Sequence, residues 1–429
     1  MQKRNNDKWN FRSLVIDGSF FSIGIAFLES NTIFPALISQ LTQNSVLIGL
    51  VSTIRNAGYL LPQLLVAGYA ERLPYKKPFL MINGLISRLS VLTMAAITFF
   101  FAGSNPSLAL VGLLAANTVF ALTDGIGGVP WIDMVAKTIP STRRGTLFGV
   151  MQFTGGIGAL VVGLFIRQIL ASATLTFPGN YSLLLIMGFV FLCVSFFGTM
   201  MVREEAGVVR QGSSFRAYLA RLPQAWRGNK LFQRMMFTRM LLAFLYLSLP
   251  FYAVYARRAL GFPESTLGFF ISAQMAGSIL AGLLWGYVGD RYGNRTVIRL
   301  AGAAAASTPA LALVSSVMAG VGYSGLALVP YLLLFASIGC TLSGMWMGFT
   351  NYLLELVEDV DRPTYIGMMN TLTAPFTFLP ILGGLLIQVL SYEVVFGVTL
   401  GVLLLGNIVA STLPEPRLGR SSSDGASMS

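Results

Sequence analysis

The stretch "GYVGDRYGNR", residues 286–295, sets Arg291 and Arg295 close to Asp290 in one short turn. The chain of 429 residues around it is 55% hydrophobic and only 11% charged. A similar charged turn, "AGYAERLPYKK", lies at residues 67–77. Charged turns that recur between long apolar stretches are typical of a chain that crosses a membrane many times. The sequence therefore predicts an all-α integral membrane protein.

Long apolar runs follow one another along most of the chain. Each run is long enough, at about 20 residues or more, to cross a hydrocarbon core of roughly 30 Å as a helix. We expect twelve transmembrane helices, at residues 13–41, 46–70, 79–102, 107–135, 146–170, 182–202, 235–256, 266–288, 297–319, 326–354, 364–387 and 394–412.

The basic residues predict the orientation of these helices. If the N-terminus is cytoplasmic, most of the 29 lysines and arginines fall in cytoplasmic segments, and only Arg167, Arg257 and Arg258 fall outside. We therefore expect a multi-pass protein of the cytoplasmic membrane with both termini in the cytoplasm. The net charge of +12 is then explained by topology and contact with lipid headgroups, and no nucleic-acid partner is expected.

The longest polar stretch between apolar runs divides the chain. We expect a cytoplasmic N-terminal segment at 1–12, a six-helix bundle at 13–202, a cytoplasmic linker with a short amphipathic helix at 203–234, a second bundle at 235–412 and a disordered tail at 413–429.

The two halves repeat one another. An offset of 219 residues superposes the two charged turns, with Glu71 on Asp290. An offset of 218 places "RGTLFGVMQ" (144–152) over "RPTYIGMMN" (362–370). Because the offset spans six helices, both copies keep the same orientation in the membrane. The pattern predicts two six-helix bundles related as a parallel repeat.

At this point the chain resembles the major facilitator superfamily of secondary transporters over residues 13–412. The family's loop signature, Gly-x-x-x-Asp-Arg-x-Gly-x-Arg, is matched by Gly286, Asp290, Arg291, Gly293 and Arg295. The first copy departs from the signature, since Glu71 replaces Asp and Pro74 replaces Gly. Residues 155–163 lack the proline-containing motif of the drug-antiporter branch, so no subfamily is assigned. The resemblance implies alternating access to a cavity between the two bundles.

The repeat suggests what the charged turns do. Asp290 would meet the start of the fifth helix near Arg144, and Glu71 the start of the eleventh near Arg362, so that the contacts latch the cytoplasmic side. The alternative is ordinary turn chemistry together with the positive-inside rule. The predicted cytoplasmic gate comprises Glu71, Arg72, Arg144, Gly286, Asp290, Arg291, Gly293, Arg295 and Arg362.

Four ionisable side chains lie deep in predicted helices, where a charge costs about 2.5–3.5 kcal/mol. Distances counted from the hairpin tips predict two ion pairs, Glu29 with Arg55 and Arg88 with Asp124. Each pair either couples proton movement to transport or simply holds its bundle together. Asp17 and Arg239 lie nearer the cytoplasmic edge, and we expect them to snorkel.

Uncharged polar residues extend the predicted substrate and proton-coupling site, although such side chains also join helices without binding a substrate. Together with the four charges, the predicted site comprises Glu29, Asn31, Arg55, Asn56, Arg88, Asp124, Gln152, Gln274 and Asn370.

Motifs for enzymatic chemistry do not appear. The chain has no histidine, and it shows no Walker loop, dinucleotide fingerprint or zinc spacing, so we expect neither an enzyme nor a cofactor or metal. Our first hypothesis is proton-coupled efflux of small amphipathic compounds by a monomer that contacts membrane lipids. Proton- or sodium-coupled symport of a polar nutrient or metabolite is the alternative, and a non-transporting receptor or lipid-handling protein on the same scaffold is a third.

Overall fold

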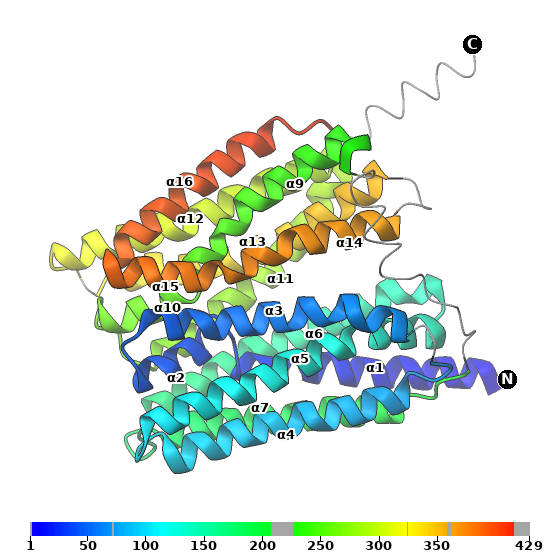
Figure 1. The fold of residues 1–429 in the computed structure, drawn as a ribbon, viewed down its shortest axis with the longest axis horizontal. Coiled ribbons are helices and arrows are strands. Elements are labelled where there is room, and N and C mark those ends of the chain that lie inside the picture. The colour runs from blue at the N-terminus through cyan, green and yellow to red at the C-terminus, as the bar shows by residue number, and fades with distance from the viewer. Residues whose placement is uncertain (1, 71–72, 207–225, 324, 358–361, 416–429) are drawn as a thin grey trace. The chain divides into compact units, whose positions relative to one another are not determined.

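The computed structural model describes residues 2–70, 73–206, 226–323, 325–357 and 362–415. These residues form a helical protein (Figure 1). The first half contains α1 (Gln2–Phe27), α2 (Ile33–Leu41), α3 (Ser45–Ala70), α4 (Lys77–Phe101), α5 (Pro106–Thr138), α6 (Ser141–Ala171) and α7 (Gly179–Met201). The second half contains α9 (Lys230–Leu242), η1 (Ala243–Leu247), α10 (Phe251–Arg258), α11 (Thr266–Tyr292), α12 (Asn294–Gly320), α13 (Leu328–Leu356), α14 (Arg362–Thr373), η2 (Ala374–Phe378), α15 (Leu379–Val389) and α16 (Tyr392–Ser411).

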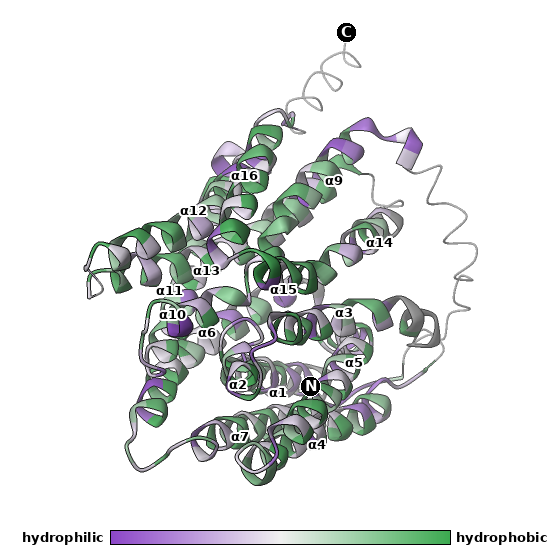
Figure 2. Ribbon diagram, turned by 60° about the vertical axis from the view of Figure 1, so that its left-hand side comes forward, coloured by the Kyte–Doolittle hydropathy of each residue, from purple (hydrophilic) through white to green (hydrophobic). Residues whose placement is uncertain are grey.

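Ten helical segments in the described part of the chain are long and apolar enough to cross a membrane. Apolar colouring runs along most of their length (Figure 2). Many large apolar side chains on these segments are exposed, for example Leu283 at 74% and Val389 at 81%, which suits a lipid environment. The two other predicted spans correspond to α1 with α2 and to α3, which are helical but not among the ten.

The first predicted span, 13–41, is broken at residues 28–32. Pro35 explains the break, because its ring clashes with the carbonyl four residues earlier and it has no N–H to donate. The Glu29 carboxylate reinforces the break by accepting a hydrogen bond from the backbone N–H of Asn31, 2.7 Å away. At its other end the helix begins at Gln2, so the predicted N-terminal segment 1–12 is largely helical.

The predicted spans 235–256 and 364–387 are also interrupted, by the 3₁₀ turns η1 and η2. Prolines account for both. Pro250 immediately precedes α10, and Pro375 lies in η2 with Pro380 five residues further on. Each proline removes one backbone hydrogen bond from its helix.

The chain divides into two compact units. Unit 1 comprises Met1–Phe215, Pro250–Ser272 and Pro380–Gln388. Within it α1 packs against α6 and α7, and α5 packs against α3 and α4. Gly198 on α7 allows close approach to α1, since a Cβ there would lie 2.6 Å from the backbone nitrogen of Asp17.

Unit 2 comprises Arg216–Leu249, Ala273–Leu379 and Val389–Ser429. Within it α12 packs against α13 and α16, and α9 packs against α16. The predicted amphipathic helix of the linker and the predicted disordered tail fall mostly on residues outside the described ranges.

Candidate functional site

The break between α1 and α2 places Glu29 in a non-helical segment of unit 1. Its side chain is 9% exposed, and its carboxylate accepts hydrogen bonds from the backbone N–H of Asn31 at 2.7 Å and from Asn31 Nδ2 at 3.2 Å. The Ser52 hydroxyl of α3 donates to the Ser30 carbonyl at 2.5 Å. The predicted site residues Glu29 and Asn31 therefore lie together, against a defined face of α3.

Four polar atoms beside this break are buried and have no hydrogen-bond partner among the described residues. Asn31 Oδ1 is an acceptor, Thr32 Oγ1 belongs to a hydroxyl that can accept or donate, and Arg55 Nη1 and Asn56 Nδ2 are donors. Buried polar atoms are almost always paired in folded proteins, because an unpaired one costs about 1–3 kcal/mol. The region thus holds four buried hydrogen-bonding atoms that the described residues leave without a partner.

The ion pairs differ from those predicted. Arg55 Nη2 pairs with Asp124 Oδ2 at 2.6 Å, across α3 and α5, whereas the prediction assigned Asp124 to Arg88. The Arg55 guanidinium also lies over the Phe120 ring, 4.6 Å from its centroid. The Arg55–Asp124 pair was not predicted, because counting from hairpin tips gives the depth of a side chain along its helix but not which neighbouring helix it faces.

Arg88 likewise does not pair with Asp124. It donates to the Leu192 carbonyl at 3.2 Å and to Ser195 Oγ at 3.3 Å. Ser195 in turn donates to Asp17 at 2.6 Å, which connects α4, α7 and α1 through one hydroxyl.

Asp17 is buried instead of snorkelling. Its side chain is 5% exposed, and its second oxygen accepts a hydrogen bond from Trp131 Nε1 at 2.7 Å. Arg239, in unit 2, also has partners inside the protein, because it donates to Thr373 Oγ1 at 3.2 Å and lies over the Phe349 ring. The indole N–H of the partly buried Trp131 needs an acceptor, but nothing in the sequence indicates that Asp17, on another helix, supplies it.

The remaining polar residues of the predicted site are spread over both units. Gln152 lies on α6 in unit 1 and is exposed, whereas Asn370 lies half-buried on α14 in unit 2. Gln274, also in unit 2, is 4% exposed, and its Oε1 is buried without a partner among the described residues.

The second charged turn joins α11 to α12 in unit 2. Gly293 has a φ of 81°, in the region that favours glycine. Arg291 donates to the Tyr287 hydroxyl at 2.6 Å, and Arg295 donates to the Leu413 carbonyl at 3.1 Å. Asp290 is exposed at the end of α11, and Gly286 lies one turn earlier.

The first charged turn is only partly described. Glu71 and Arg72 lie outside the described residues, as does the side chain of Arg362, which begins α14. Arg144 donates to the carbonyls of Ala136 at 2.6 Å and Ile139 at 3.1 Å, at the C-terminal end of α5.

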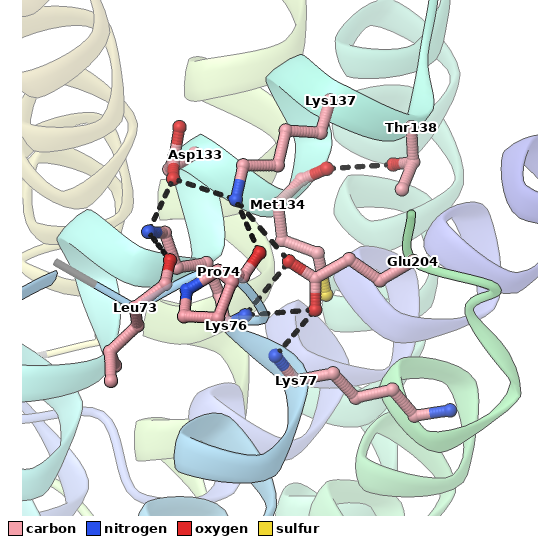
Figure 3. A network of polar contacts seen from close by, with 9 residues as sticks. All are labelled: Leu73, Pro74, Lys76, Lys77, Asp133, Met134, Lys137, Thr138 and Glu204. Atoms are coloured by element: carbon pink, nitrogen blue, oxygen red, sulfur yellow. Dashed lines mark hydrogen bonds and ion pairs between the residues drawn. The ribbon is translucent and has the colours of Figure 1, made fainter. Parts of the chain in front are cut away.

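A carboxylate after α7 holds the start of α4 (Figure 3). Glu204 accepts hydrogen bonds from the backbone N–H groups of Lys76 at 2.8 Å and Lys77 at 2.7 Å. Lys137 lies 3.6 Å from Glu204 and 3.4 Å from Asp133. A carboxylate at a helix N-terminus accepts hydrogen bonds from the free N–H groups and interacts favourably with the positive end of the helix dipole. Sequence reasoning missed this network because it assigned Glu204 to the linker.

Polar contacts within unit 1 join α10 to the end of α2. Arg258 donates to the carbonyls of Ser39 at 2.6 Å and Thr42 at 2.8 Å. Glu264 forms an ion pair with Arg257 and accepts a hydrogen bond from Gln40. These residues come from opposite halves of the sequence and were not predicted to meet.

Glycines bring helix backbones together in the same unit. A Cβ at Gly268 of α11 would collide with the Gly163 carbonyl of α6 and would lie 2.5 Å from the backbone nitrogen of Arg167. A Cβ at Gly49 of α3 would collide with the Pro380 carbonyl of α15. Two pairs of helices, each with one member from either half of the sequence, therefore touch at their backbones.

Comparisons with known proteins agree with this arrangement of helices. The family model described as "Major Facilitator Superfamily" matches residues 235–427. Solved structures with a similar fold include a bacterial homologue of the iron transporter ferroportin in an inward-facing state (12% identity, 94% of this chain and 98% of that chain, TM-score 0.71). The fold is also similar to that of a D-xylose-proton symporter (15% identity, 95% of this chain and 98% of that chain, TM-score 0.69). It is similar as well to the nucleoside transporter NupG (15% identity, 94% of this chain and 98% of that chain, TM-score 0.68). No protein with a curated description matches the sequence.

Proposed function

We propose that this multi-pass membrane protein is a transporter of the Major Facilitator Superfamily, whose family model matches its second half, and that it couples the movement of protons to the export of small amphipathic compounds. Twelve membrane-spanning helices in two six-helix bundles would carry it out by alternating access, with both termini in the cytoplasm. We expect the chain to act as a monomer in contact with membrane lipids, with protons and a small-molecule substrate as its partners.

Buried charge in unit 1 is the observation that supports proton coupling. Glu29 lies in a helix break with its carboxylate 9% exposed, and Asp124 lies in an ion pair at 2.6 Å from Arg55. Ionisable groups inside a membrane are costly and are typical of proton and ion pathways. Since the chain has no histidine, we propose that a carboxylate carries the proton.

Exchange follows if a proton and a substrate compete for Glu29. A charged Glu29 attracts a substrate with a positive group, and a protonated Glu29 releases it. If Glu29 binds the substrate on one side of the membrane and a proton on the other side, the two move in opposite directions, which is antiport.

Everted membrane vesicles with an acidified lumen test this proposal. A pH-sensitive dye follows the gradient while lipophilic cations, neutral antibiotics, sugars and amino acids are added in turn. We expect one class of solute to release protons with wild-type protein and not with Glu29→Gln, whereas the control Glu205→Gln, an exposed position, behaves like wild type. Normal release by Glu29→Gln would refute the role of Glu29.

Symport is the second candidate, because a D-xylose-proton symporter shares this fold. The same vesicles distinguish the two directions when no gradient is imposed. A symporter moves protons in the same direction as the added solute, and an antiporter moves them in the opposite direction. Binding of a solute that never crosses the vesicle membrane would instead indicate a receptor.

A further inference from the structure

We infer that unit 1 binds a small zwitterionic solute between the α1–α2 break and the adjoining face of α3. This inference rests on the proposed transport function and names the chemical class of the substrate. It follows from the four buried atoms without partners, which fall into an acceptor group and a donor group.

The acceptor group lies in the break itself. Thr32 is 0% exposed, and its Oγ1 has no partner among the described residues, as is true of Asn31 Oδ1. Glu29 adds a carboxylate that Asn31 holds in place. Oxygens and negative charge at a helix discontinuity suit a cation that donates hydrogen bonds, such as an ammonium group.

The donor group lies on α3. Asp124 binds Nη2 of Arg55 and the Phe120 ring covers the guanidinium face, so that the side chain is fixed in one orientation. Nη1 of the same guanidinium and Nδ2 of the adjacent Asn56 are buried without partners in the described part of the chain. An N–H of a fixed guanidinium is a strong donor to a carboxylate.

The two groups are neighbours. Ser52 on α3 contacts the break through its hydrogen bond to the Ser30 carbonyl. Arg55 and Asn56 follow Ser52 by three and four residues, which places them on the same helix face. At 1.5 Å per residue they lie about 4.5–6 Å further along the axis. A ligand with its two charges separated by a few carbon atoms can reach both groups.

A zwitterion is the class that uses all four atoms. An amine without an acid would leave Arg55 Nη1 and Asn56 Nδ2 unpaired, and an acid without an amine would leave the amide oxygen Asn31 Oδ1 unpaired. Sites whose buried polar groups stay unpaired discriminate strongly against the ligand that fails to pair them.

Binding to the purified full chain in detergent, with no gradient present, tests the inference. The probes are linear ω-amino acids of two to six carbons, each with the matched alkylamine, carboxylic acid and amide, and the readout is the shift in thermal unfolding as the probe is titrated. We expect one chain length of the amino acid to bind at least about tenfold more tightly than its matched amine or acid. Equal binding of amine and amino acid, or no binding in any series, would overturn the inference.

Two variants separate binding from structure. Thr32→Val should weaken the binding of the amino acid by about 10- to 100-fold. The thermal stability of the variant without ligand should be unchanged or raised, because the substitution removes an unpaired hydroxyl. Asn56→Ala should weaken the binding of the probes that carry an acid and leave the binding of the amine unchanged. The control Thr98→Val removes a buried hydroxyl that is already bonded, to the Met94 carbonyl at 2.8 Å, and should leave binding unchanged.

The outcomes also separate this inference from the proposed function. Tight binding of the amino acid without proton movement in vesicles would refute proton coupling and leave the zwitterion site standing. Proton-coupled movement of a solute from another class, with no binding of the amino acids, would refute the site and leave transport standing.

Discussion

Substitution of Gly268 by alanine should disturb the end of unit 1 where α11 meets α6. The added Cβ would collide with the Gly163 carbonyl and would lie 2.5 Å from the Arg167 nitrogen and 2.7 Å from the Arg167 Cβ. Van der Waals contact between such atoms needs about 3.5 Å or more, so the helices must separate by roughly 1 Å. Overpacking of this kind costs about 1–3 kcal/mol.

Under the proposed alternating access, that cost would be specific to one state. If α11 and α6 touch only while this end of the protein is closed, about 1–3 kcal/mol shifts the equilibrium toward the open state by roughly 5- to 150-fold. Overall stability should change less, because alanine is also the better helix former by about 1 kcal/mol.

Labelling of a cysteine measures the shift. Ser45 at the start of α3 is 4% exposed and follows Thr42, whose carbonyl accepts a hydrogen bond from Arg258 at the end of α10, ten residues before Gly268. In a background with Cys193 and Cys340 replaced, Ser45→Cys should react faster with a membrane-impermeant maleimide when Gly268→Ala is present.

Gly282→Ala is the matched control, because a Cβ at that position on the same helix meets nothing within 4 Å. Both variants must be folded for the comparison. If Ser45→Cys is then labelled as slowly with Gly268→Ala as with Gly282→Ala, the reasoning that backbone contact closes this end is refuted.

Two further substitutions test the charged contacts of unit 1. Glu204→Ala leaves the N–H groups at the start of α4 without their carboxylate, so the free energy of unfolding should fall by about 1–3 kcal/mol. Thermal unfolding in detergent measures this loss. A loss no larger than that of the exposed control Glu205→Ala would contradict the prediction. Asp124→Asn removes the partner of Arg55 and should cost about 3–5 kcal/mol. Because Arg55→Gln in the same chain removes the unpaired charge, the double variant should be more stable than Asp124→Asn alone, and strictly additive losses would speak against the pair.

Helix positions followed from the sequence because a membrane demands long apolar segments, and those segments are visible in a single chain. The break at residues 28–32 was also within reach, since Pro35 cannot continue a helix through that segment. The partners of the buried charges were not. Arg55 and Asp124 lie 69 residues apart, and their pairing depends on which face of α3 packs against α5.

Other parts of the site arise from contacts between distant segments. Asp17 is held by Trp131 and Ser195, which come from different helices, and neither neighbour is suggested by spacing. Glu204 was assigned to a linker, yet its carboxylate reaches the start of α4. The inclusion of residues 250–272 and 380–388 in unit 1 depends on close backbone packing at a few glycines, which a hydropathy pattern does not encode.

The break in the first span also has a consequence for biosynthesis. The segments that carry Glu29 and Arg55 are α1 with α2 and α3, which are not among the ten helices apolar enough to span a membrane in the described chain. A charge at a helix centre disfavours entry from the translocon by about 2.5–3.5 kcal/mol. These segments, which leave the ribosome before α5, are therefore more reluctant to partition into lipid than the ten apolar helices. Their stable insertion should await α5, whose Asp124 neutralises Arg55, so that the residues proposed for transport also delay the first steps of assembly.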